Sequence, residues 1–140
     1  MEDRKMARVQ ANPMNVISFE AGEDLSSSQY YAVQVDATAR EVKVAGTPAA
    51  EGTHVLGVLQ NKPVEGDAAS VATGGTSLLY MADNCDIGDK IMSSSGKGTP
   101  VDADQKSVIG IALSANANGD GGLIEILITP GGIGQVDESN

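Results

Sequence analysis

Two stretches of the sequence decide the fold: GVLQNKPVEGDAASVA at residues 57–72 and GIALSANANGDGGLIEI at residues 110–126. Each starts with glycine and an apolar run, continues into a polar turn that holds Gly-Asp, and returns as a second apolar run. Short apolar runs separated by turn residues at close intervals predict an all-β sandwich or barrel. The likeness of the two stretches indicates either two related hairpins packed in one barrel or a chance similarity between ordinary hairpins.

Further β-type runs lie on both sides of these stretches. Period-two alternation is clearest in YYAVQVD at 30–36 and REVKVA at 40–45, which are close enough to form a hairpin. The sequence also predicts a turn at 73–77, one helical turn at 83–88 and a flexible tip at 94–98. No long stretch has helical periodicity. The predicted strands are 15–20, 30–36, 40–45, 53–60, 67–73, 76–81, 89–93, 107–114 and 122–129.

The predicted fold is a compact β-barrel or β-sandwich of short antiparallel strands with little helix, and 140 residues fit one domain. Residues 1–14 form an extended N-terminal arm, residues 15–130 the β domain and residues 131–140 an acidic C-terminal tail. The chain has one Phe, three Tyr and no Trp. Its core therefore gains buried area from many small contacts between Val, Ile, Leu and Ala.

The charge of the chain limits its partners. A formal net charge of −10 and a pI near 4.3 oppose binding to nucleic-acid backbones. The apolar runs are too short to span a membrane. The single cysteine excludes an intrachain disulfide, and the N-terminus lacks the apolar segment of a signal peptide, so we expect synthesis in the cytosol.

The residues that most often carry catalysis are scarce. His54 is the only histidine, and it falls on the outward side of its strand if Val55 points inward. Cys85 lies between Asp83 and Asp86, whose charges disfavour a reactive thiolate. One His and one Cys do not supply a tetrahedral zinc site.

The motifs for phosphate and calcium fail at defined positions. A phosphate loop ends in Gly-Lys followed by Ser or Thr, but Gly98 follows Gly96-Lys97 here. The residues at 116–121 resemble the first half of a calcium loop, but Leu127 stands where the closing Glu belongs. Asp83, Asp86 and Asp89 fit a solvated acidic face better than a metal site. We expect no catalytic, cofactor-binding or metal-binding residues.

Two more segments complete a family likeness: ISFEAGEDL at 17–25 and DIGDKIMSSSGKGTPV at 86–101. With the two stretches quoted first, they resemble the small tailed-phage proteins described as capsid decoration or cement proteins, over about residues 15–130. These motifs are patterns of strands and turns and include no catalytic fingerprint. Some members of that family are labelled as RecA-like recombinases, a label that the missing phosphate loop does not support here.

The resemblance implies a structural protein on the outside of the virion capsid. Such a protein binds the major capsid protein, bridges capsomers and stabilises the shell against the pressure of the packaged DNA; related proteins commonly form homotrimers. It would be present in the host cytoplasm during assembly. The N-terminal arm offers apolar anchors and cations for acidic capsid patches. The expected contact residues are Arg4, Lys5, Met6, Arg8, Val9, Met14 and Ile17.

Two other functions compete with this interpretation. The first is a module of a phage tail or fibre, or one that binds the host surface, and the location of the protein on the particle distinguishes it. The second is a DNA-processing protein, and DNA-dependent ATP hydrolysis distinguishes that one.

Overall fold

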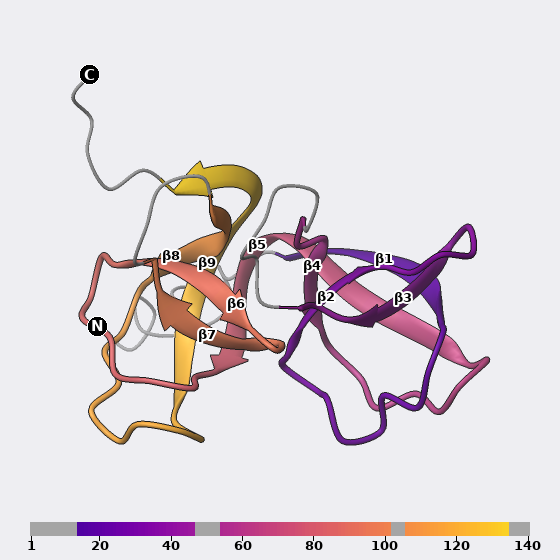
Figure 1. Ribbon diagram of the computed structural model, residues 1–140, viewed down its shortest axis with the longest axis horizontal. Helices are drawn as coiled ribbons and strands as arrows, with labels where there is room; N and C mark the ends of the chain where they lie inside the picture. Colours follow the sequence, from indigo (N-terminus) through magenta and orange to yellow (C-terminus); the bar gives the residue numbers. More distant parts are fainter. Residues whose placement is uncertain (1–13, 47–53, 102–105, 135–140) are drawn as a thin grey trace, which may run out of the picture.

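The computed structural model describes residues 14–46, 54–101 and 106–134, and these contain nine β-strands and no α-helix (Figure 1). The all-β prediction is therefore confirmed. The strands pair in the order β1-β3-β2-β4-β5-β9-β8-β6-β7, with an additional pairing of β1 with β5. The strands are β1 (Met14–Ala21), β2 (Ala32–Val35), β3 (Glu41–Val44), β4 (Gly57–Leu59), β5 (Ala68–Tyr80), β6 (Lys90–Ser94), β7 (Lys97–Pro100), β8 (Lys106–Ala112) and β9 (Leu123–Gly134).

The strands form two closed rings of five that share β5. Ring 1 consists of β1, β3, β2, β4 and the first half of β5, and it closes through parallel pairing of Ala21 with Val42. Ring 2 consists of the second half of β5, β9, β8, β6 and β7, and it closes through a parallel bridge between Met81 and Gly98. Figure 1 shows β5 extending from one ring into the other.

The two rings have the same topology and the same pairing register. In ring 1, Val33 pairs with Gly57; at the corresponding place in ring 2, Ile91 pairs with Gly110. A Cβ added to Gly57 would overlap the carbonyl oxygen of Ala72, and a Cβ added to Gly110 would overlap that of Leu127. Both glycines therefore allow the same close approach of two backbones.

Side-chain hydrogen bonds repeat as well. The Asn61 side-chain oxygen accepts from the Ser70 backbone N–H at 3.0 Å in ring 1. The Ser114 hydroxyl oxygen accepts from the Glu125 backbone N–H at 3.0 Å at the corresponding place in ring 2. The likeness of 57–72 and 110–126 is therefore a structural duplication, and each hairpin lies in its own ring instead of sharing one barrel.

Backbone conformations that favour glycine occur at corresponding turns in the two rings. In ring 1 two of these positions hold large side chains, whereas ring 2 has glycine at all of them. The corresponding pairs are Tyr30 (φ 67°) with Gly88 (φ 92°), Arg40 (φ 68°) with Gly96 (φ 92°), and Gly66 (φ 91°) with Gly121 (φ 95°).

Each ring has an apolar interior. Ring 1 is filled by a cluster of buried residues made of Ala21, Leu25, Val33, Val42, Leu59, Ala69 and Val71, with Phe19, Val44 and Leu56 packed against it. The interior of ring 2 includes Leu79, Met81, Ile91, Ile109, Ile124 and Ile126. Its cluster also contains Ala32, Val58 and Ala72. These three residues alternate with the interior residues of ring 1, so they lie on its outer face and join the two rings.

Several local expectations were wrong. The predicted turn at 73–77 lies inside the continuous strand β5. Residues 83–88 contain no helical turn, because Cys85 forms a β-bridge with Asn116. The predicted flexible tip at 94–98 is a tight hairpin that connects β6 and β7, and the strand predicted to end at Thr129 continues to Gly134.

Candidate functional site

β1 carries exposed apolar side chains along an edge that is mostly unpaired among the described residues. One edge of β1 pairs with β5 from Met14 to Glu20, whereas among the described residues the other edge pairs with a strand, β3, only at Glu20 and Ala21. The side chains of Met14, Val16 and Ile17 are 41%, 49% and 43% exposed. An exposed apolar strand edge of this kind is one with which another chain can pair.

Arg40 holds the β2–β3 connection against this edge. Its guanidinium donates to the Ser18 carbonyl oxygen at 2.8 Å and lies 4.8 Å from the centre of the Phe19 ring. These contacts offset the cost of the left-handed backbone at Arg40. A cation therefore lies beside the apolar part of β1. We call Met14, Val16, Ile17 and Arg40 together the β1 edge.

Two of the contact residues expected from the sequence, Met14 and Ile17, fall on the β1 edge and are accessible there. The other five lie outside the described residues: Arg4, Lys5, Met6, Arg8 and Val9. Val16 and Arg40 are not among the contact residues expected from the sequence. The alternation in NVISFE at 15–20 was the signal for Val16, whereas the position of Arg40 depends on the β2–β3 hairpin.

A second apolar surface covers the outer face of ring 2. Thr76 pairs with Leu127, Leu78 with Glu125 and Tyr80 with Leu123, so these side chains share one face of the sheet. Pairing of Ile111 with Leu127 extends the face onto β8. We call this surface the leucine face, and its apolar members are Leu78, Ile111, Leu113, Leu123 and Leu127.

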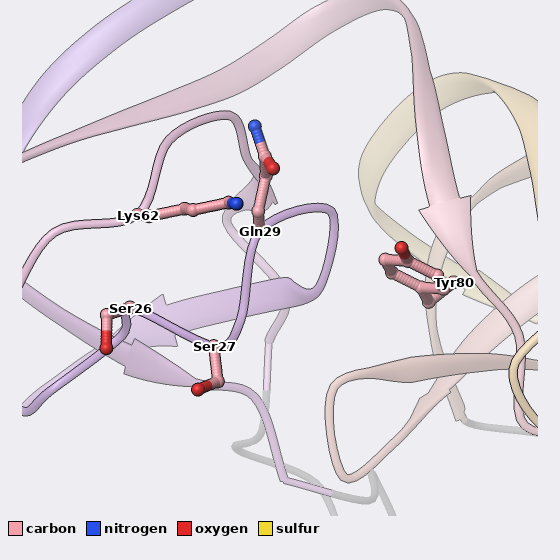
Figure 2. Close-up of a pocket in the computed structure, with 5 residues that line it drawn as sticks. All are labelled: Ser26, Ser27, Gln29, Lys62 and Tyr80. Carbon is pink, nitrogen blue, oxygen red and sulfur yellow. The ribbon is translucent and has the colours of Figure 1, made fainter.

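A polar pocket of about 210 Å³ lies where the two rings meet (Figure 2). Tyr80 of β5 forms one wall, and Lys62 with residues of the β1–β2 connection forms the other. The lining residues are Ser26, Ser27, Gln29, Lys62 and Tyr80. The ring of Tyr80 is 6.4 Å from that of Tyr30 and 6.0 Å from that of Tyr31. Three of the four aromatic side chains therefore contribute to the junction of the rings.

The structure describes the surroundings of the residues that were considered for chemistry. His54 is exposed. Asn116 is buried; its amide donates to the carbonyl oxygens of Asp83 and Gly119 at 2.8 and 3.0 Å. That amide therefore links two loops. Within the described residues, no group of acidic, His and Cys side chains is arranged to hold a metal ion. Likewise, no helix of the described chain has the length and apolar character needed to cross a bilayer.

Cys85 is 5% exposed, and burial is the main cause that raises the pKa of its thiol. The carboxylates of Asp89 and Asp86 raise the pKa further, while a backbone hydrogen bond from Asn116 lowers it. The thiol is therefore protonated at neutral pH and shielded from reagents.

We expect Cys85 in the folded protein to react with a disulfide reagent at pH 7.5 about a hundredfold more slowly than in urea. Ile87 is 71% exposed in the same loop. In Ile87→Cys with Cys85→Ala, the thiol should react at the rate of an unfolded one. Rapid labelling of Cys85 without unfolding would show that the loop opens independently.

The described part of the chain is thus an all-β protein made of two fused rings, with two exposed apolar surfaces. Neither a scan against family models nor a search of the curated proteins finds a match. Among solved structures, the fold is similar to the N-terminal base of the head fibre gp8.5 of bacteriophage phi29, with a TM-score of 0.60 and 16% identity. The match covers 84% of this chain and 95% of that chain.

Proposed function

We propose that this chain is a structural protein of a tailed-phage virion that binds the outer surface of the assembled head and reinforces the shell without catalysing a reaction. The observation that carries this proposal is the β1 edge, whose apolar side chains lie beside an open strand edge. The likeness in fold to a phage head-fibre base, together with the decoration-protein motifs, supports a place on the head.

In this proposal the β1 edge is the attachment site, and residues 1–13, which precede it directly, extend the contact. The major capsid protein is the partner, and an added strand would satisfy the backbone groups of β1. Binding only to the assembled shell stabilises that shell by linkage. Three linked copies per site, as in related decoration proteins, would multiply a modest contact through effective concentration.

Val16→Asp tests the attachment site. A charge in a desolvated apolar contact is costly, so we expect the affinity for capsids assembled without this protein to fall at least about tenfold. Val64→Asp is the matched control, because Val64 is also 49% exposed but lies on the β4–β5 connection. Cosedimentation with capsids and the melting temperature of the decorated shell are the measurements.

The control should bind and protect the shell as the parent does, and circular dichroism should show that both variants are folded. Equal binding by Val16→Asp and the parent would eliminate the β1 edge as the attachment site. Unchanged heat stability of shells with and without the parent protein would eliminate the reinforcing role itself.

The head-fibre likeness favours a second candidate, in which this chain is the base that attaches a fibre to the head. Gold-labelled protein would then appear beneath projecting fibres instead of across the bare shell. Label on the tail would contradict both candidates.

A further inference from the structure

The leucine face is unusually apolar for an exposed sheet surface. Leu78, Leu113, Leu123 and Leu127 are each between 39% and 44% exposed. The alternate residues of β9, which are Ile124, Ile126 and Ile128, point into ring 2, so β9 has apolar side chains on both faces there. Exposed apolar side chains gathered on one sheet face in this way mark a candidate site of association.

The duplication shows what covers the corresponding face of ring 1. Val58 and Ala72 occupy in ring 1 the positions that Ile111 and Leu127 occupy in ring 2. Both ring 1 residues are fully buried in the cluster that joins the rings. Apolar residues from the interior of ring 2 therefore cover this face of ring 1, whereas Leu127, on the corresponding face of ring 2, remains 39% exposed.

The charge distribution favours a second copy as the occupant. The chain carries a net charge of −10, so two copies repel each other over most of their surfaces. The leucine face has one charged residue, Glu125, among its apolar members, and Lys90 lies at its margin next to Ile111. This face is therefore where two acidic copies can approach with little charge repulsion.

We propose that the leucine face binds the leucine face of a second copy of this chain, around a rotational symmetry axis that passes through it. Apolar side chains then meet apolar side chains, as the interiors of symmetric interfaces require. This inference does not depend on the phage assignment. It leaves the β1 edge on a different surface, free to bind another partner.

Leu127→Glu tests the proposal because symmetry would place the new carboxylates of neighbouring copies against each other. The molar mass in solution, measured by sedimentation over a range of concentrations, should fall to that of one chain, with at least a tenfold weaker self-association. Ile87→Glu is the matched control: Ile87 is exposed, but it lies in the loop before β6. It should keep the oligomeric mass of the parent.

A second variant keeps the proposal testable if Leu127→Glu fails to fold. Leu123→Cys places a thiol on the leucine face, and mild oxidation should join copies through it, whereas Ile87→Cys should not. A parent protein that is monomeric at all concentrations, or one whose mass is unchanged by Leu127→Glu, would overturn the proposal. Loss of capsid binding by Leu127→Glu with the oligomer intact would also overturn it, because the occupant would then be the shell.

Discussion

Replacing Gly110 with alanine is expected to lower the free energy of unfolding by about 3 kcal/mol or more. The added methyl group would overlap the backbone carbonyl of Leu127, which has no flexible side chain that could move away. Gly57→Ala should have an effect of similar size, because its methyl group would overlap the carbonyl of Ala72. Equilibrium urea unfolding followed by circular dichroism measures both.

Gly46→Ala is the control for this pair. Gly46 is exposed, and among the described residues the atom nearest to a methyl group there is the side-chain oxygen of Gln34, at 3.8 Å. We expect a change within about 0.5 kcal/mol. If Gly57→Ala and Gly110→Ala lowered the free energy of unfolding as little as this control, the close backbone contacts at these glycines, and the strand register that depends on them, would be contradicted.

Gly98→Val and Met81→Ala are expected to compensate each other. Ring 1 closes through the small Ala21 and the larger Val42. In ring 2 the large Met81 stands in the place of Ala21, and Gly98 stands in the place of Val42. A Cβ added to Gly98 would lie 2.6 Å from the Met81 sulfur, so Gly98→Val alone overfills ring 2 and should cost about 1–3 kcal/mol. Met81→Ala alone leaves a cavity and should cost about 2–5 kcal/mol.

The double variant should be less destabilised than the sum of the two by about 1–3 kcal/mol, the coupling expected of side chains that share one space. The reverse exchange in ring 1, Ala21→Met with Val42→Gly, should show coupling of the same sign. Additive effects in both rings would mean that the two closures are not equivalent, and the duplication would then be limited to the hairpins.

Much of the fold follows from the sequence because the period-two alternation and the turn residues are local signals. The hairpin of 30–36 and 40–45 is confirmed as β2 and β3, and the repeated stretches are confirmed as corresponding hairpins. Val42, on the apolar side of the alternation at 40–45, is fully buried.

The errors arise where distant segments override local preference. Gly74 and Gly75 predict a turn, yet β5 continues through them because β1 pairs with β5 up to this point and β9 pairs with it beyond. Strand β7 was overlooked because Ser95 and Gly96 resemble a flexible tip. With φ of 53° and 92°, they instead form the tight turn that suits a two-residue hairpin.

The candidate site also has a part that the sequence predicts and a part that it does not. The exposure of Met14 and Ile17 is consistent with their expected role in binding, which remains a prediction. The leucine face was not anticipated, although LIEILIT at 123–129 shows apolar residues on both faces of one strand. Whether such a strand is buried on both faces or carries an exposed surface depends on what packs over it, which the sequence does not specify.

The shared strand β5 also determines how the molecule responds to load. Tandem domains are usually tied by a linker that stretches when they are pulled apart, but here one continuous strand belongs to both rings. Separating the rings along β5 requires many main-chain hydrogen bonds to be sheared together. We therefore expect a force applied to one ring to be transmitted to the other through β5 with little extension of the chain between them.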